Sequence, residues 1–512
     1  MTSPAIPDNE CVSAWKRPLV SFPLLTALLV FIGGAMSAQA LADADSYWHV
    51  AVGRWILQHH QFPTQDYFSH SMPGVAWTAH EWLSEIVLFE GYQYFGWTGL
   101  QIIASVCFAI TAAYMLRFAL QRMEPVHALP FVAICLSMVS THFLVRPHVL
   151  VWPLTALWLG TLFAASESRR DPPWWLLVVL LLWTNLHASV VIAIGIAGLV
   201  AADATWQEPS MPTRLARAKR WLPFLCVSVL CVLVNPQGVG TFVHAFEIMR
   251  MKSTLAVIGE WQSADFHTFQ FILLWIVGVM ALAFTGRLRL SLFRIVFVLG
   301  FFYLALKHQR YHSLLGLVSP FVLAVPLAHA FRREGAPASD NADGLDALFR
   351  RLSQPAQWIG VAAIAAMGAA FTLVARDLIP YAPGAATTPV KALAAFEATG
   401  VKGNVFNGYG LGGFLIFKSV PVFVDGRADM YGDPFMDTLG DAMLLRVPQA
   451  LEKVLTKYRI AWTMLGPKTA AVELLDHLPA WQRIYGDSVA VVHVRRDLLH
   501  AARPGLSPPT HQ

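Results

Sequence analysis

Charged residues are scarce in this sequence of 512 residues. Asp, Glu, Lys and Arg make up 13% of the chain and apolar residues 56%, whereas about a quarter of a soluble protein is usually charged. The mean hydropathy is +0.51. This composition excludes an ordinary soluble domain and predicts a polytopic membrane protein. The net charge of +5 does not indicate a nucleic-acid partner, because the arginines lie in short clusters between apolar segments, as in cytoplasmic loops of membrane proteins.

Cysteine is also scarce. The five cysteines all lie in the N-terminal tail or in apolar segments: Cys11, Cys107, Cys135, Cys226 and Cys231. No extramembrane pair therefore offers a disulfide or a metal-ligand spacing. The histidines form no i, i+4 pair with a nearby third ligand, so their spacing does not favour a zinc site.

The chain contains eleven apolar segments that suit spanning helices. They lie near 19–41, 97–120, 126–144, 148–165, 174–187, 188–205, 221–234, 270–286, 295–307, 314–331 and 357–375. The first imitates a signal peptide, because Lys16-Arg17 precedes it and AMSAQA ends it. Its length of about 20 residues fits a spanning helix. Since ten further segments follow, we expect a retained anchor.

The basic clusters predict the orientation of these segments. With the N-terminus in the cytoplasm, every loop expected inside is basic. These loops carry Lys16 and Arg17, Arg117 and Arg122, Arg169 and Arg170, Arg214 to Arg220, Arg287 to Arg294, Arg332-Arg333 and Arg350-Arg351. We therefore expect a cytoplasmic tail over 1–18 and a transmembrane domain over 19–375. The first loop, 43–96, the loop 235–269 and the region after Arg376 then lie on the periplasmic side of the inner membrane.

Polar residues at the ends of the apolar segments collect on that outer side. Ionisable groups near a bilayer are costly and usually face a bundle interior or a water-filled cavity, so the set predicts one extracytoplasmic site. The alternative is that each residue is a helix end that meets water. The set comprises Asp43, Asp45, Arg146, His148, Asn185, His187, Asn235, Glu260, Lys307, His308 and Arg310.

The first outer loop contains two predicted amphipathic helices. SYWHVAVGRWILQHH has an apolar stripe with His49 and Arg54 against it, and it could lie in the membrane interface. Pro63 and the SHSMPG segment interrupt the pattern. A second helix is expected from about Thr78, through HEWLSEIVLFEGYQYF and into the next span.

The region 376–500 predicts a small extracytoplasmic α/β domain. Helical patterns (TPVKALAAFEATG, QALEKVLTKY) alternate with short apolar runs expected as strands (FLIF, VPVFV, IAWTML, VAVVHV). VDGRADMY, from Val424 to Tyr431, is either functional or an Asp-Gly turn with an Arg-Asp ion pair, and the turn is the favoured interpretation. GYGLGGF, 408–414, lacks a dinucleotide-binding spacing and is expected to be a turn. The tail 501–512 is expected to be disordered.

The chemistry of the outer layer suits group transfer from a lipid phosphate. Two carboxylates separated by one residue, Asp43 and Asp45, can share a divalent cation such as Mg²⁺ or Mn²⁺, or one can act as general base. Asp-Xaa-Asp alone is a weak signal, because helix caps produce it often. Arg146, Lys307 and Arg310 supply guanidinium and ammonium groups that match phosphate oxygens.

The sequence resembles the GT-C superfamily of integral-membrane glycosyltransferases, which take sugars from polyprenyl-phosphate donors. The likeness lies in the motifs DADSYWH, GRWIL, PTQDYFS, HEWLSE, RPH, NLH, NPQG and VDGRADMY, and in the acidic first loop. It is more particularly similar to bacterial multispanning proteins of the protein-mannosyltransferase or oligosaccharyltransferase kind. The chain lacks the adjacent acidic pair of the former and a WWDYG-type motif of the latter.

The resemblance implies a role for several residues. It makes Asp43 or Asp45 the catalytic base, and Arg146, Lys307 and Arg310 the binders of the lipid phosphate. It gives Asp66, His80, Glu81 and Glu260 no role beyond the lining of the site. The remaining substrate-binding candidates come from the first loop and the outer layer: Arg54, His148, Asn185, His187 and His308.

The function expected from this resemblance is a sugar transfer at the outer face of the inner membrane. The partners would be a lipid-linked sugar donor, membrane lipids and a saccharide, lipid or protein acceptor. Two alternatives stay open: a transporter or flippase of lipid-linked saccharides, and a non-catalytic scaffold of an envelope assembly. Against a transporter, the spans show no inverted repeat and no paired interrupted helices.

Overall fold

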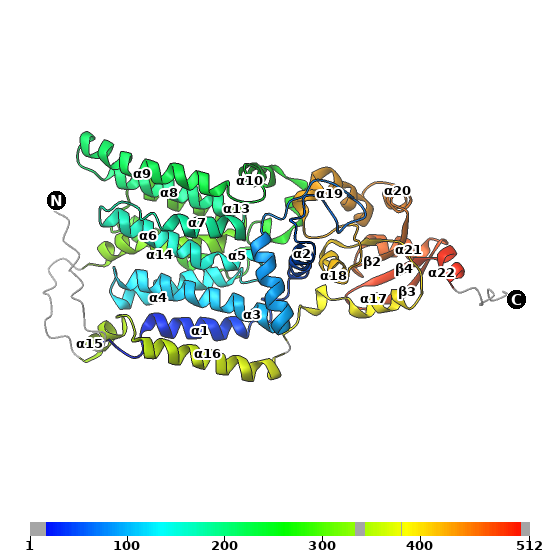
Figure 1. Ribbon diagram of the computed structural model, residues 1–512, viewed down its shortest axis with the longest axis horizontal. Helices are drawn as coiled ribbons and strands as arrows, with labels where there is room; N and C mark the ends of the chain where they lie inside the picture. Colours follow the sequence, from blue (N-terminus) through cyan, green and yellow to red (C-terminus); the bar gives the residue numbers. More distant parts are fainter. Residues whose placement is uncertain (1–16, 333–343, 380, 503–512) are drawn as a thin grey trace.

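The computed structural model describes residues 17–332, 344–379 and 381–502. Residues 1–16 and 503–512 lie outside the described residues, and most of the predicted cytoplasmic and disordered tails falls on them. The described chain forms a bundle of helices with a small α/β unit packed on one end of it (Figure 1). The predicted combination of a helical body and a C-terminal α/β unit is confirmed.

Each of the eleven apolar segments coincides with a helix of the bundle. The helices are α1 (Phe22–Ala35), α3 (Trp82–Leu120), α4 (Pro125–Ser140), α6 (Trp152–Glu167), α7 (Leu176–Leu186), α8 (Val190–Trp206), α9 (Met211–Val232), α12 (Phe271–Phe284), α13 (Leu292–Lys307), α14 (Tyr311–Phe331) and α16 (Trp358–Leu378). Within the described ranges, α3, α14 and α16 are long and apolar enough to cross a membrane, and α1, α4, α7, α8 and α12 are apolar but shorter. The number of spans stays a prediction.

Short helices cover the two ends of the bundle. The elements α2 (Asp45–His59), α5 (Pro147–Leu150), α10 (Gly240–Arg250), α11 (Ser253–Val257) and η2 (Gly259–Trp261) lie at the end that carries the C-terminal unit. The amphipathic α15 (Gly344–Leu352) lies at the opposite end, as Figure 1 shows.

Helix α2 is more enclosed than its apolar stripe predicted. Residues 46–53 and Ile56 are buried, because α3 packs on one side of the helix and the C-terminal α18 (Gly412–Phe417) on another. His49, expected on the polar side, is only 3% exposed and faces Glu81 and Glu85. The prediction of a solvated polar side is therefore wrong at His49.

A kink at Gly96 joins the second predicted amphipathic helix to the span that follows it. Gly96 has φ 61° inside α3, a left-handed conformation that glycine adopts without a steric penalty. The predicted helix begins at Trp82 rather than near Thr78, and it continues through this kink into the bundle.

The C-terminal unit is built on a four-stranded sheet in the order β1-β2-β4-β3. Strand β1 (Asn404–Asn407) pairs in parallel with β2 (Ile460–Leu465), whereas β4 (Val491–Arg495) pairs antiparallel with β2 and with β3 (Trp481–Gly486). The helices around it are α17 (Val390–Glu397), α18, α19 (Ala428–Leu444), α20 (Ala450–Lys457), α21 (Ala470–His477) and α22 (Arg496–Ala502), with short turns η3 (Ala385–Thr387) and η4 (Tyr409–Leu411). Two of the predicted strands, IAWTML and VAVVHV, and both predicted helices are present.

Two predicted strands are wrong, and one predicted turn is present only in part. FLIF lies in α18, VPVFV makes only an isolated bridge from Val422 to Ser69, and GYGLGGF forms η4 and the start of α18. Two glycines let α18 pack closely on its neighbours: a Cβ would lie 2.1 Å from the Val424 carbonyl oxygen at Gly412 and 2.2 Å from the Ala44 carbonyl oxygen at Gly413. Gly413 thus lets α18 pack directly on the first loop, and Gly412 lets it pack on the segment before Asp425.

Candidate active site

Arg146 and Arg310 bind three carboxylates at the end of the bundle that faces the C-terminal unit. Arg146 Nη2 contacts the Asp43 carboxylate and lies 2.9 Å from Asp45 Oδ2, and Arg146 Nη1 lies 3.2 Å from Glu260 Oε2. Arg310 Nη1 donates to Glu260 Oε1 over 3.0 Å. We call these five residues the Arg146 cluster. The side chains of the four residues other than Arg310 are each less than a fifth exposed.

Backbone contacts hold the first loop against Arg146. The Val145 amide donates to the Ala40 carbonyl over 2.7 Å, and Ser46 Oγ donates to the Val145 carbonyl over 2.8 Å. Asp43 Oδ1 accepts the Asp45 amide over 2.9 Å at the start of α2. The spacing Asp-Xaa-Asp therefore lets both carboxylates face one guanidinium.

A second set of backbone contacts brings Glu260 and Arg310 together. The Arg310 amide donates to the Glu260 carbonyl over 3.1 Å, and the Gln309 amide donates to the Gln262 carbonyl over 2.9 Å. The turn η2 is thus fixed to the chain between α13 and α14.

The charges of the Arg146 cluster do not cancel when all three carboxylates are ionised. Burial raises the pKa of Asp45 to about 7, although Arg146 opposes this shift. Burial would also raise the pKa of Glu260, but Arg146 and Arg310 outweigh it and lower that pKa to about 2. Near neutral pH, Asp45 is therefore the carboxylate that exchanges a proton, and Glu260 stays ionised.

Glu81, just before α3, is the centre of a neighbouring group. His187 Nε2 lies 3.3 Å from Glu81 Oε1, and His49 Nε2 lies 4.0 Å from Glu81 Oε2. Burial raises the pKa of Glu81 to about 8 and the charge of Asp429 adds to this shift, while Arg146 opposes it. Glu81 thus extends the polar layer from the Arg146 cluster toward α10 and α19.

A cavity of about 80 Å³ begins at this layer and continues between the helices. Its polar end is lined by His142, His148, His187 and Arg310. Its apolar lining comes from α6, α7, α8 and α14 and includes Trp152, Trp183, Ile192, Ile196 and Leu317. A larger groove of about 630 Å³ between α1, α3 and α16 has none of the residues of the Arg146 cluster in its lining. The smaller cavity thus has Arg310 and three histidines at one end and an apolar lining between the helices.

Several candidates from the sequence fasten the surrounding helices together. Asn185 accepts a hydrogen bond from Trp82 Nε1 over 2.8 Å and donates to the Val234 carbonyl over 2.9 Å. His148 Nε2 lies 3.0 Å from the His142 carbonyl oxygen, and the His308 ring contacts the Trp261 carbonyl oxygen. These contacts hold the ends of the helices around the cavity.

Three other candidates lie away from the Arg146 cluster. Arg54 Nη2 donates to the Phe417 carbonyl over 3.1 Å, which fastens α2 to α18. Asp66 is buried and lies 2.7 Å from Arg427. Lys307 is exposed, and within the described residues its ammonium has no contact with the Arg146 cluster. The structure thus does not bring these three together with Asp43 and Asp45.

VDGRADMY contains the ion pair that the favoured interpretation expected. Arg427 binds Asp425 through two nitrogens, Nε and Nη2, at 2.8 and 2.7 Å, and both side chains are buried. The motif also reaches the site, because a Cβ at Gly426 would lie 1.9 Å from Asp45 Oδ1.

Sequence reasoning missed several residues of the polar layer. His49 and Glu85 were hidden in predicted amphipathic helices, and their side chains lie 3.6 Å apart. His142 Nε2 lies 3.6 Å from Glu260 Oε2. The pKa of the Tyr409 hydroxyl is raised, first by burial and then by the charge of the nearby Asp45 carboxylate. The only available signal was the closeness of His142 and His49 to the RPH and DADS motifs.

The carboxylates of Asp43 and Asp45 do not fit a shared divalent cation in this arrangement. Arg146 Nη2 contacts both of them, so a guanidinium already stands where the cation would bind. A cation there would have to displace Arg146 and face its positive charge.

No protein-family model and no curated protein matches the chain. Among solved structures, it is similar to ArnT from Cupriavidus metallidurans bound to undecaprenyl phosphate, at 13% identity and a TM-score of 0.47, over 93% of this chain and 98% of that one. It is also similar to the archaeal oligosaccharyltransferase AglB from Archaeoglobus fulgidus in complex with an inhibitory peptide and a dolichol-phosphate, at 11% identity and a TM-score of 0.48, over 87% and 69% of the two chains. At these identities, residue roles follow from the geometry of this chain alone.

Proposed function

We propose that this chain is a glycosyltransferase that moves a sugar from a polyprenyl-phosphate donor to an acceptor at the outer face of the inner membrane. The observation that carries the proposal is the carboxylate of Asp45 paired with Arg146, in a cluster whose second arginine, Arg310, lines the polar end of an apolar cavity. A base works best when its pKa lies near the working pH, and Asp45 meets that condition.

The reaction divides its roles between the carboxylate and the arginines. An acceptor hydroxyl or amide attacks the anomeric carbon and gives its proton to Asp45. The bond between that carbon and the phosphate oxygen breaks, and polyprenyl phosphate leaves with the bonding electrons. Arg310 and Arg146 stabilise the charge that develops on the phosphate. Asp43 and Glu260 hold the two guanidiniums in place.

The arrangement of charge supports the proposed orientation. At the other end of the bundle, basic residues of the predicted cytoplasmic loops pair with acidic residues of neighbouring helices. Arg122 pairs with Glu167 over 2.8 Å, and Arg294 pairs with Asp203 over 3.2 Å. With that end in the cytoplasm, the Arg146 cluster and the C-terminal unit face the periplasm.

Turnover of a labelled donor tests the proposal. Purified protein in detergent is mixed with polyprenyl phosphates that each carry one labelled sugar, together with an envelope extract as the source of acceptor. We expect release of polyprenyl phosphate and label in the acceptor fraction. Asp45→Asn should abolish both, whereas Asp437→Asn, an exposed carboxylate on α19, should not. A donor that stays intact in every mixture would instead point to transport and contradict the proposal.

A further inference from the structure

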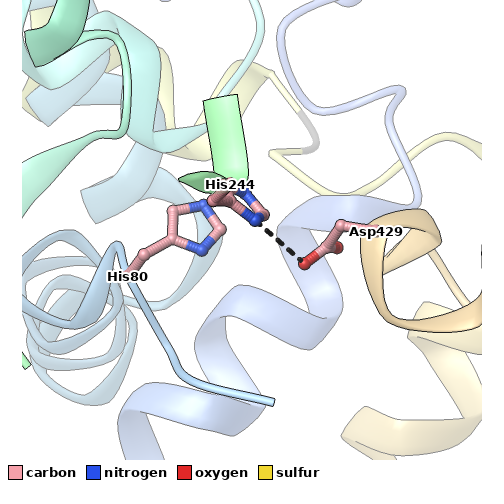
Figure 2. A group of neighbouring side chains, drawn as sticks. All are labelled: His80, His244 and Asp429. Atoms are coloured by element: carbon pink, nitrogen blue, oxygen red, sulfur yellow. Dashed lines mark ion pairs between the residues drawn. The ribbon is translucent and has the colours of Figure 1, made fainter. Parts of the chain in front are cut away.

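Two histidines and one aspartate from distant parts of the chain converge beside the polar layer. His80 lies in the loop before α3, His244 in α10 and Asp429 in the first turn of α19. Figure 2 shows the three side chains pointing toward one another. Each offers a ligand atom, and these three atoms lie within 4.8 Å of one another. His244 Nδ1 and Asp429 Oδ2 are 4.0 Å apart.

The imidazoles of this trio have unused hydrogen-bonding capacity. His80 Nδ1 and His244 Nε2 are buried and have no hydrogen-bond partner within the described residues. Buried polar atoms without a partner are uncommon in folded proteins, and an ion is one explanation. The centroids of the two rings are 4.5 Å apart, and the ring planes are tilted by 47° to each other.

The charge around the trio also favours a cation. Asp429 supplies a carboxylate that faces His244. No arginine or lysine is paired with Asp429 within the described residues. This differs from the Arg146 cluster, in which each of the three carboxylates is paired with a guanidinium.

We propose that His80, His244 and Asp429 bind a divalent transition-metal ion, with Zn²⁺ as the preferred ion. Two imidazole nitrogens and one carboxylate oxygen are a ligand set that suits Zn²⁺, whereas Mg²⁺ and Ca²⁺ prefer oxygen ligands. Glu81 Oε1 lies 3.8 Å from His80 Nε2, so a further carboxyl group stands beside the trio. Ligands of a tetrahedral ion at about 2.1 Å lie about 3.4 Å apart. The His244 and Asp429 ligand atoms, 4.0 Å apart, therefore need to approach by about 0.6 Å, and a pair at the 4.8 Å limit by about 1.4 Å.

The ion fastens the C-terminal unit to the loop that carries Glu260. A hydrogen-bonded contact already joins these two parts, because Asp433 accepts from the Lys252 amide over 2.8 Å and from the Thr254 amide over 2.9 Å. The metal adds a second attachment, one that also includes the start of α3. Its removal should loosen α10 and α11 and with them the turn that positions Glu260. This role does not depend on the proposed sugar transfer.

Metal content tests the site directly. Full-length protein is purified in detergent, incubated with Zn²⁺, freed of unbound ion by gel filtration and analysed by mass spectrometry of the elements. We expect about one Zn²⁺ per chain in the wild type. His244→Ala and Asp429→Asn should lose it, and His244→Cys should keep it because a thiolate is also a zinc ligand. His267→Ala, an exposed histidine of the same outer loop, is the matched control and should keep it.

Thermal unfolding supplies an independent readout. Zn²⁺ should raise the Tm of the wild type and of His267→Ala, because a ligand that binds only the folded state stabilises it. Mg²⁺ should not, and Asp429→Asn should show no shift with either ion. Equal Zn²⁺ content in the wild type, His244→Ala and Asp429→Asn would overturn the proposal. A wild-type Tm that Zn²⁺ leaves unchanged would overturn it even if some variants fail to fold.

Discussion

Arg146 is the residue on which the candidate site depends. Its two terminal nitrogens reach Asp43, Asp45 and Glu260, so one side chain joins the first loop to the turn η2. Arginine can do this because its planar fork presents several donors in fixed directions, whereas lysine is a point charge on a flexible stem. The guanidinium is therefore both a structural link and the nearest cation to the proposed base.

Arg146→Lys should lower the rate of sugar transfer by about 10²-fold or more, the usual cost of losing one group that stabilises developing charge. The ammonium keeps the charge but cannot contact all three carboxylates at once. The measurement is the initial rate of polyprenyl phosphate release by purified protein. Arg250→Lys, at an exposed arginine of α10, is the control and should keep the wild-type rate. Equal rates in the two variants would remove Arg146 from the mechanism.

The pKa of Asp45 predicts how transfer depends on pH. Because that pKa is about 7 in the folded chain, the rate should rise with pH and level off above about pH 8, where a general base with this pKa is ionised. The rate is measured over a series of buffers at constant ionic strength. A flat profile from about pH 5 to about pH 9 would be incompatible with Asp45 as the base.

The raised pKa of Asp45 also makes the stability of the folded chain depend on pH. The unfolded chain loses the Asp45 proton at about pH 4, while the folded chain holds it until about pH 7. Folding therefore becomes less favourable as pH rises through this window. In Asp45→Asn, the Tm should decline less between these pH values than in the wild type. An identical decline in both proteins would show that Asp45 does not titrate in this range.

At the scale of elements, the turn of VDGRADMY lies directly against the start of α2. A Cβ at Gly426 would lie 1.9 Å from Asp45 Oδ1 and 2.8 Å from Trp48 Nε1, distances that no side chain tolerates without movement. The glycine thus allows the C-terminal unit to close over the first loop. It also sets where the Asp45 carboxylate stands relative to Arg146.

Gly426→Ala should displace Asp45 and lower the transfer rate, with a loss of stability of about 1 to 3 kcal/mol, as overpacking usually costs. The matched control is Gly410→Ala in η4, where nothing lies within 4 Å of an added Cβ. Both variants are compared by transfer rate and by Tm. If Gly426→Ala behaves like Gly410→Ala, the contact between the turn and α2 does not position the base.

The sequence predicted the helices better than the contacts between them. Apolar segments and arginine clusters are local signals, so each predicted segment coincides with a helix of the bundle. FLIF was misread because a short apolar run gives no periodicity with which to tell a buried helix from a strand.

Lys307 and His244 show why the site could be predicted only in part. Lys307 lies only three residues before Arg310 in the sequence. It is the last residue of α13, however, and its side chain is exposed. His244 reaches His80 and Asp429 only because α10 and α19 fold onto the same end of the bundle, and no spacing in the sequence records that approach. Asp43, Asp45 and Arg146 were predictable together because each lies in a short motif next to an apolar segment.

For the whole molecule, the candidate site exists only where the bundle and the C-terminal unit meet. The first loop contacts that unit through Tyr47 and Thr388, whose hydroxyls lie 2.9 Å apart, and through Asp66 and Arg427. Arg427 is 1% exposed and binds two buried carboxylates, Asp66 and Asp425. Its guanidinium therefore links the first loop to the C-terminal unit.

Arg427→Leu should destabilise the folded chain by about 3 to 5 kcal/mol, because it leaves two buried carboxylates without a counter-charge. Arg446→Leu, at an exposed arginine of the same unit, is the control and should change the Tm little.

The pH dependence gives a further check. Burial would raise the pKa of Asp425, but Arg427 outweighs it and lowers that pKa, so this contribution to stability is present above about pH 4 and is lost as pH falls below it. The wild-type Tm should therefore fall in acid more steeply than the Tm of Arg427→Leu. Matching Tm values for Arg427→Leu and Arg446→Leu at neutral pH would mean that this ion pair does not hold the C-terminal unit on the bundle.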